Sequence, residues 1–147
     1  MIRRSKRSAV AFATTMFVAG VFVGSAFQSW SVARAQGHRV FEVRTYTAPE
    51  GKLQDLHKRF RDHTMRIFKK HGIESVIYLA PQDAPVKDNT LIYIVSHASR
   101  DQAKKNWADF QADPEWTKVS AESQVNGRIV SKVDSVFADA TDYSPMK

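Results

Sequence analysis

The chain of 147 residues contains no cysteine. This absence excludes disulfide bonds, zinc sites built from thiolates, a cysteine nucleophile and a lipid anchor attached to cysteine. It does not decide the compartment, because an exported protein can lack cysteine as readily as a cytosolic one.

Motifs for common chemistry are also missing. The sequence offers no phosphate-binding glycine loop, no Ser-His-Asp grouping and no pair of catalytic carboxylates. His57, His63 and His71 fall in one predicted helix, but no two of them have the i, i+4 spacing that lets both bind one ion. We therefore expect no metal site. We also expect His97, at the end of a predicted strand, to lie at the surface.

Little basic charge remains beyond the N-terminal segment. The formal net charge is +7, but residues 1–35 contain five basic side chains and no acidic one, so 17 basic and 15 acidic side chains remain in the rest. Nucleic-acid binding requires a dense set of cations on the phosphate backbone. We therefore expect no nucleic-acid partner.

Residues 1–35 read as a targeting segment. A basic start precedes an apolar run at 9–27, and Ala33 and Ala35 before Gln36 fit a signal-peptidase site. The run also approaches the ~20 residues that cross a bilayer, so an uncleaved membrane anchor through residues 9–27 is the alternative. Either interpretation exports residues 37–147, to the periplasm or the exterior, and the anchor would hold the domain outside the cytoplasm.

The remaining sequence alternates strand and helix patterns. Leu53, Leu56, Phe60, Thr64 and Ile67 form an apolar helical stripe, and basic residues such as Arg59 lie mainly off it. Thr47 and Ser99 each begin a capping-box pattern and are predicted helix caps, and Asp113 is the predicted cap of a third helix. The patterns predict strands at 39–46, 74–80, 90–97 and 128–138, and helices at 49–71, from 99 onward and from 113 to 123.

This order predicts an α+β, ferredoxin-like β-α-β-β-α-β domain with an extra short helix before the last strand. In "TLIYIVSH" (90–97), large apolar residues lie on both faces of the strand. Two helices can cover only one face of the sheet. We expect the same face of a second copy to cover the other, which gives a homodimer, or alternatively the chain's own tail or a protein partner.

Three segments carry a family resemblance. "FEVRTYTAPEGKLQDLHKRFRDHTMRIFKKHGI", "DPEW" and "DATDYSPM" resemble the NIPSNAP family over residues 39–145. The resemblance implies a ferredoxin-like, dimeric α/β-barrel domain over residues 37–147. That superfamily includes small monooxygenases, some haem-degrading and some that form quinones without a cofactor. It implies no particular reaction for this chain.

Four residues are candidates for lining a ligand pocket: Arg44, Tyr46, His63 and Trp107. If the strand face that carries Arg44 and Tyr46 meets the helices, the arginine fork could bind a carboxylate or an enolate. The alternative is an ion pair of Arg44 with Glu42, or across strands, at a sheet edge or dimer seam. His63 is our choice for any haem role, although no cofactor is expected.

Two functional hypotheses follow. The first is an exported or anchored NIPSNAP-like dimer without an assignable reaction, which binds a small apolar or aromatic ligand or a protein partner. The second is a cofactor-independent or haem-linked monooxygenase that uses the space under the first helix. An enzyme should have an enclosed cavity of roughly 300 Å³ or more, with converging polar groups.

Overall fold

The structure is a computed structural model, and it describes residues 39–146. The predicted targeting segment at 1–35, with its apolar run at 9–27, lies outside the described residues. Within residues 39–146, no helix is both long enough and apolar enough to span a bilayer.

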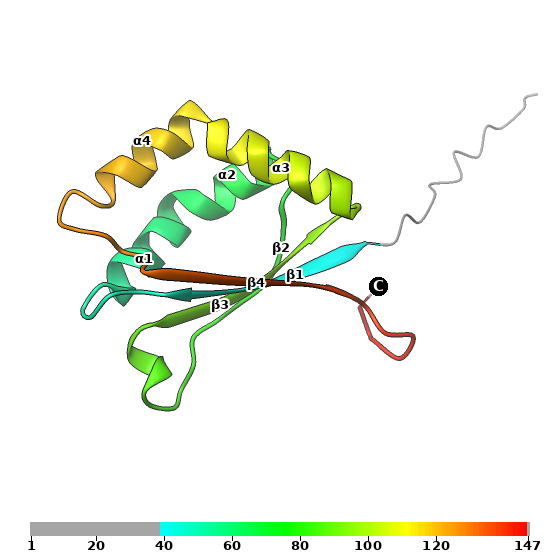
Figure 1. Ribbon diagram of the computed structural model, residues 1–147, viewed down its shortest axis with the longest axis horizontal. Coiled ribbons are helices and arrows are strands. Elements are labelled where there is room, and N and C mark those ends of the chain that lie inside the picture. Colours follow the sequence, from blue (N-terminus) through cyan, green and yellow to red (C-terminus); the bar gives the residue numbers. More distant parts are fainter. Residues whose placement is uncertain (1–38, 147) are drawn as a thin grey trace, which may run out of the picture. The chain divides into compact units, whose positions relative to one another are not determined.

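Four antiparallel strands form one sheet (Figure 1). They are β1 (Val40–Thr47), β2 (Glu74–Leu79), β3 (Thr90–His97) and β4 (Lys132–Asp139), in the spatial order β2-β3-β1-β4. This order and the alternation with helices agree with the ferredoxin-like arrangement. The predicted strands are confirmed. β4 begins four residues later than expected, because Ile129 is buried in the core and Ser131 bonds to the carbonyl of Thr47.

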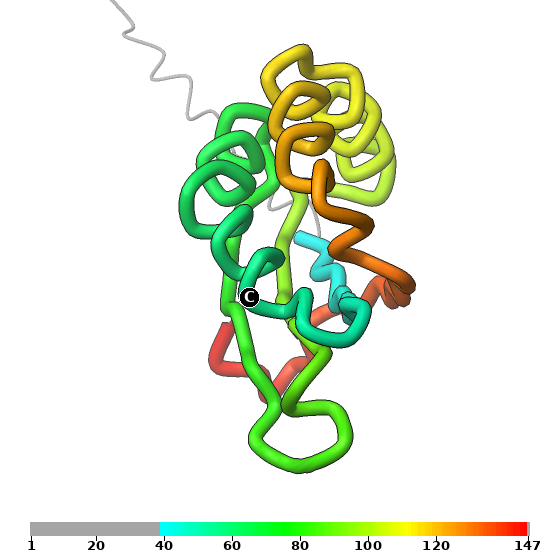
Figure 2. Tube along the Cα trace, turned by 90° about the vertical axis from the view of Figure 1, so that its left-hand side faces the viewer, coloured from blue at the N-terminus to red at the C-terminus, as the bar shows by residue number. Residues whose placement is uncertain are grey.

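Helices cover one face of this sheet. A continuous helical run comprises α1 (Leu53–Arg59), the π-helix η1 (Phe60–Thr64) and α2 (Met65–Lys70). The other helices of this layer are α3 (Arg100–Ala112) and α4 (Pro114–Glu122). A short 3₁₀ turn, η2 (Val86–Asp88), lies between β2 and β3. Figure 2 shows the α1–α2 run beside the α3–α4 pair, in a single layer.

Two of the three predicted helix caps are confirmed. Ser99 Oγ accepts a hydrogen bond from the Gln102 amide at 3.1 Å, and Asp113 Oδ1 accepts one from the Glu115 amide at 2.7 Å. The predicted cap at Thr47 is wrong. Thr47 belongs to β1, where it pairs with both β3 and β4, and the helix begins only at Leu53. Sheet pairing on both sides of Thr47 overrides a local capping pattern.

The core lies between the two layers. All five residues of the predicted apolar stripe are buried, and edge-to-face aromatic contacts join Phe60 to Phe68 and Tyr93. Such pairs add stabilisation beyond the burial of apolar area. The helices therefore seal the inner face of β3 with aromatic side chains.

The outer face of the sheet carries apolar side chains that no second layer of residues 39–146 covers. Ile77 and Leu79 on β2 are 43% and 42% exposed, and Val136 on β4 is 64% exposed. Ile92 and Ile94 lie between them on β3 and are half-buried. The sequence-based expectation of two apolar sheet faces with one helical layer is therefore confirmed.

Candidate functional site

Glu42 is the centre of a buried polar network on β1. This strand lies between β3 and β4, and the Glu42 side chain, 1% exposed, faces the helices. Its carboxylate accepts hydrogen bonds from Arg44 Nη1 at 2.5 Å, from Trp107 Nε1 at 2.6 Å and from the Ser135 hydroxyl at 2.6 Å. His97 Nε2 lies 3.3 Å from the same carboxylate. The network therefore joins three strands to α3.

The Glu42 carboxylate is strongly acidic. Burial raises its pKa, but hydrogen bonds from His97, Ser135 and Trp107, together with the charge of Arg44, outweigh burial and lower the pKa to about 2. The carboxylate is therefore ionised at neutral pH. With so low a proton affinity, Glu42 is poorly matched to work as a general base near pH 7.

His97 is buried, 2% exposed, so its predicted surface position is wrong. β3 continues through His97, and the alternation of the strand places this side chain on the helix side, with Tyr93 and Val95. Nδ1 lies 3.3 Å from the amide nitrogen of Asn106, which donates to the Gly72 carbonyl at 2.8 Å. Both ring nitrogens of His97 therefore have protein partners.

Arg44 combines an ion pair with an aromatic contact. Its Nη2 donates to the Tyr46 hydroxyl at 3.4 Å, and its guanidinium carbon lies 4.3 Å from the centroid of the Trp107 ring. Burial lowers the pKa of Arg44, but Tyr46, Tyr93 and Glu42 raise it more, so the group stays charged. The predicted Arg44–Glu42 ion pair exists, but it lies beneath the helices and not at a sheet edge. Arg44 Nε is buried without a partner.

Arg59, the last residue of α1, is a second buried cation, and the sequence analysis missed it. It is 6% exposed, and no carboxylate of the described chain pairs with it. Nη1 lies 3.4 Å from the Ser123 hydroxyl, the guanidinium carbon lies 5.1 Å from the centroid of the Trp116 ring, and Nε has no partner. Burial lowers its pKa. The available signal was its position three residues after Leu56, at the border of the apolar stripe.

The π-helix η1 begins directly after Arg59. The Thr64 hydroxyl donates to the Arg59 carbonyl at 3.2 Å within this wider turn. Single π turns inside helices occur frequently at functional sites. His63, which lies within this turn at the border of the apolar stripe, is exposed to solvent, so it does not line the space under the helix as expected.

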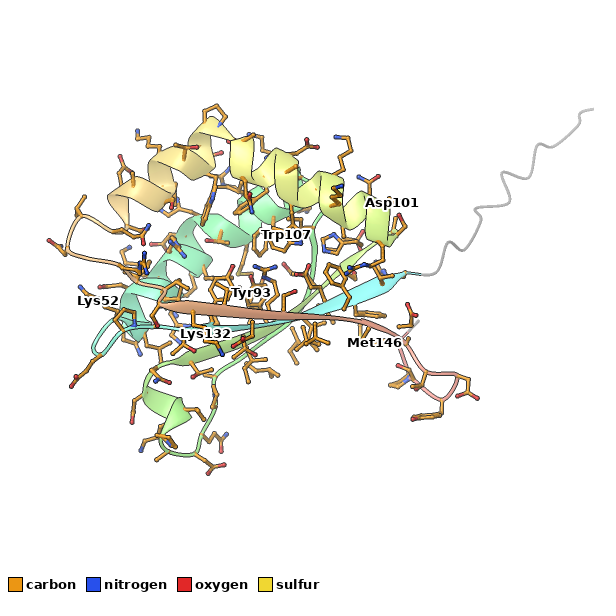
Figure 3. The ribbon with its side chains drawn as sticks, viewed as in Figure 1. Lys52, Tyr93, Asp101, Trp107, Lys132 and Met146 are labelled. Carbon is orange, nitrogen blue, oxygen red and sulfur yellow. The ribbon has the colours of Figure 1, made fainter. Side chains whose placement is uncertain are left out.

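Tyr93 on β3 is fully buried, and its hydroxyl has no hydrogen-bond partner. Its ring lies 5.2 Å from that of Tyr46 and 5.7 Å from that of Tyr78, between centroids. Burial and the neighbouring Tyr46 raise the pKa of Tyr93, so the hydroxyl stays protonated. Figure 3 shows Tyr93 and Trp107 in the layer between the helices and the sheet.

These side chains form one arrangement. Of the four predicted pocket residues, the structure brings Arg44, Tyr46 and Trp107 together and leaves His63 outside. We use the name helix–sheet site for the set Arg44, Tyr46, Arg59, Tyr93 and Trp107. The set combines two cations with aromatic rings, which suits the recognition of an electron-rich molecule.

The helix–sheet site reaches solvent on its β4 side. Val133 and Ser135 of β4 lie opposite Tyr46 and Arg44 on β1, and both β4 side chains are exposed. Tyr46 and Trp107 are only half-buried. The helices pack mainly on β2 and β3, which leaves the inner face of β4 open.

A second feature is an open pocket of about 220 Å³ between η1 and β2. Its lining includes His57, Arg61, Met65 and Tyr78, and none of the four predicted pocket residues. Residues 39–146 contain no group of three side chains that could hold a metal ion. Both ring nitrogens of the neighbouring His97 are engaged, by Glu42 and Asn106, and His63 is exposed to solvent.

The NIPSNAP family model matches residues 41–145. This chain belongs to the NIPSNAP family. The family resemblance expected from the sequence is thereby confirmed, and the helix–sheet site lies inside the matched region. No curated protein matches the chain.

Several solved structures share the NIPSNAP fold seen here. A NIPSNAP family protein of unknown function from Agrobacterium tumefaciens is 23% identical, covers 76% of this chain and 96% of its own length, and has a TM-score of 0.66. A second NIPSNAP family protein from the same organism is 21% identical, covers 75% of this chain and 100% of its own length, and has a TM-score of 0.66. A NIPSNAP-like domain protein from Burkholderia xenovorans is 15% identical, covers 74% of this chain and 90% of its own length, and has a TM-score of 0.65. At these identities the likeness establishes the fold alone.

Proposed function

We propose that this NIPSNAP domain binds a small aromatic or apolar molecule at the helix–sheet site. The observation that carries the proposal is the stack of the Arg44 guanidinium on Trp107, at a point where the half-buried Trp107 and Tyr46 meet solvent. Buried charges seldom contribute net stability compared with apolar side chains of similar volume. Two arginines and an unpaired tyrosine hydroxyl in the core therefore favour a role in recognition.

Native mass spectrometry of the protein, expressed from its full coding sequence, tests the proposal by detecting a co-purified small molecule. A fluorescence titration with naphthalene derivatives provides a second readout, because Trp107 belongs to the site and Trp116 lies against Arg59. We expect Trp107→Ala to abolish binding and Arg61→Met, which changes the open pocket, to leave it unchanged. The proposal fails if no aromatic compound binds and none co-purifies.

A monooxygenase reaction is the second candidate. Arg44, Arg59 and the Tyr93 hydroxyl provide positive charge and a donor, which stabilise an enolate or phenolate of the kind that reacts with oxygen. We rank the reaction below simple binding because Glu42, with a pKa of about 2, is a poor proton acceptor. Oxygen uptake with bound quinols supports the reaction, and binding without uptake argues for a binding domain.

We also propose that two copies pair through the outer face of the sheet. With strands about 4.8 Å apart and about 3.3 Å per residue, a face made of three strands of eight residues and one of six covers roughly 500 Å². Two such faces bury about 1,000 Å², near the lower bound for a specific interface. A two-fold contact matches this apolar face to itself, and a second copy is therefore the simplest cover.

Sedimentation velocity of the full chain measures this pairing. Val136→Asp places a charge on the outer face and should convert the dimer to a monomer. Val125→Asp is the control, because Val125 is 77% exposed and lies in the connection between α4 and β4. A monomeric wild type overturns the proposal.

For residues 1–35 we propose export of the domain or its attachment to a membrane. The basic start, the apolar run at 9–27 and Ala33 and Ala35 support this proposal. Cell fractionation with N-terminal sequencing separates the alternatives. A soluble exported protein that begins at Gln36 indicates cleavage, and a full-length membrane-bound protein indicates an anchor. Cytoplasmic recovery of the full-length soluble chain contradicts both.

A further inference from the structure

We propose that the ligand of the helix–sheet site is an aromatic carboxylate, and that Arg44, Arg59 and the Tyr93 hydroxyl bind its carboxylate group. This inference rests on the proposed function, since it names the class of molecule that occupies the same site. Three observations carry it: the charge balance of the site, its free hydrogen-bond donors and its aromatic walls.

The charge balance leaves one buried positive charge without a partner. Arg44 is paired with Glu42, whereas Arg59 has no carboxylate partner in the described part of the chain. Buried charges in proteins are normally paired or bound to an ion. A ligand with one negative charge would supply the missing partner of Arg59.

Three buried donors of the helix–sheet site are free. Arg44 Nε, Arg59 Nε and the Tyr93 hydroxyl are all buried without partners. Arg44 Nη2 lies 3.4 Å from the Tyr46 hydroxyl, and the rings of Tyr46 and Tyr93 are 5.2 Å apart between centroids. Phe60, which follows Arg59 in the chain, has its ring centroid 6.0 Å from that of Tyr46 and 5.2 Å from that of Tyr93, so the helical run that carries Arg59 packs on the same tyrosine pair that Arg44 approaches from β1.

The shape of the free donors selects a carboxylate. The Nε edge of a guanidinium, together with one terminal nitrogen, presents two parallel donors, a spacing that matches the two oxygens of a carboxylate. The Tyr93 hydroxyl can donate a third hydrogen bond to the same group. A single-oxygen anion would leave at least one of these donors unpaired.

The walls of the site select an aromatic body. Trp107 stacks on Arg44 and Trp116 on Arg59, with 4.3 and 5.1 Å between each guanidinium carbon and the ring centroid. Entry is from the β4 side, where Val133 and Ser135 are exposed. Phe110 packs against both indoles, with its ring centroid 5.7 Å from that of Trp107 and 4.4 Å from that of Trp116, so the aromatic body of the ligand would lie on the open β4 side of Trp107, with its carboxylate toward the arginines.

The test compares two probes of equal shape, 2-naphthoate and its neutral amide, 2-naphthamide. Each is titrated into the full-chain protein, and binding is measured by isothermal titration calorimetry and tryptophan fluorescence. We expect the wild type to bind the acid at least about ten-fold more tightly than the amide, as is typical of a charge-assisted bidentate pair. Arg59→Met should remove this preference, and Tyr93→Phe should reduce it several-fold.

Arg61→Met is the matched control, since Arg61 is an exposed arginine on the same helical run and lines the open pocket. This variant should keep the full preference for the acid. Equal affinity for acid and amide in the wild type overturns the carboxylate assignment but leaves the proposed function intact. Binding of neither probe counts against both. Loss of acid binding in Arg61→Met but not in Arg59→Met assigns the ligand to the open pocket and overturns the inference.

Discussion

The indole nitrogen of Trp107 and the carboxylate of Glu42 lie 65 positions apart in the chain and meet at 2.6 Å. This hydrogen bond joins α3 to β1 across the core. The same carboxylate also accepts from Arg44 and Ser135, so one side chain satisfies donors from three elements. Glu42 therefore holds Arg44 and Trp107 of the helix–sheet site in place and does not itself contact the proposed ligand.

Replacing Glu42 with glutamine should destabilise the protein by about 3 kcal/mol, because Arg44 would keep a buried charge without its partner. Urea denaturation followed by circular dichroism measures the free energy of unfolding. Glu122→Gln is the control, since Glu122 is exposed and its pair with Lys118 spans 3.9 Å, and we expect a change within about 0.5 kcal/mol. Equal stability of both variants would contradict the role of Glu42.

The stability of the protein should fall in acid because of Glu42. Its pKa is about 2 in the folded state, below its ordinary value of 4.5, so the folded state binds fewer protons than the unfolded chain. The contribution is complete above about pH 4.5 and is lost as the pH falls toward 2, and it amounts to about 3 kcal/mol. Denaturation curves from pH 6 to pH 2 should show a weaker acid dependence in Glu42→Gln. Other acidic groups titrate in both the wild type and Glu42→Gln. If the free energy of unfolding falls equally with pH in the two proteins, the acid dependence does not come from Glu42.

Arg59→Met should raise the free energy of unfolding by about 1 kcal/mol, because a buried cation without a partner is replaced by an apolar side chain of similar length. Thermal unfolding without ligand detects the gain. Arg61→Met, at an exposed position, should change the stability by less than about 0.5 kcal/mol. A clear loss of stability in Arg59→Met would mean that the guanidinium is structural.

Tyr93→Phe should leave the stability unchanged within about 0.5 kcal/mol, because the hydroxyl that it removes has no hydrogen-bond partner. Tyr93→Leu, by contrast, removes the ring contacts with Tyr46 and Tyr78 and should cost about 2 kcal/mol or more. Chemical denaturation of the two variants separates the hydroxyl from the ring. A large loss in Tyr93→Phe would reveal a hidden partner for the hydroxyl.

Regular patterns made most of the fold predictable. β3 occupies the predicted residues 90–97, and the stripe from Leu53 to Ile67 is buried as expected, because hydrophobic periodicity reports directly on which side of an element meets the core. Thr47 shows the limit of local patterns. Its capping motif competes with two strand pairings, and the sequence does not reveal how many neighbours a strand has.

The candidate site was only partly predictable. Strand parity put Arg44 and Tyr46 on one face without saying which face meets the helices, and helix periodicity put Trp107 on the buried side of its helix. His63, at the border of the apolar stripe, is exposed. His97 was missed because a polar residue at a strand end usually meets solvent, and here Glu42, 55 positions earlier, provides a buried partner. Arg59 was missed because a basic residue at the border of an apolar stripe usually extends to solvent.

The sequence by itself determined the alternation of elements, the ferredoxin-like order and the family, because these depend on short-range periodicity and on motifs along the chain. Only the tertiary structure decided that Glu42, Arg44 and Arg59 share the interior with Tyr93. Burial of a charge depends on which distant groups surround it, and side chains from β1, α1, β3 and α3 come together only when the helices close over the sheet.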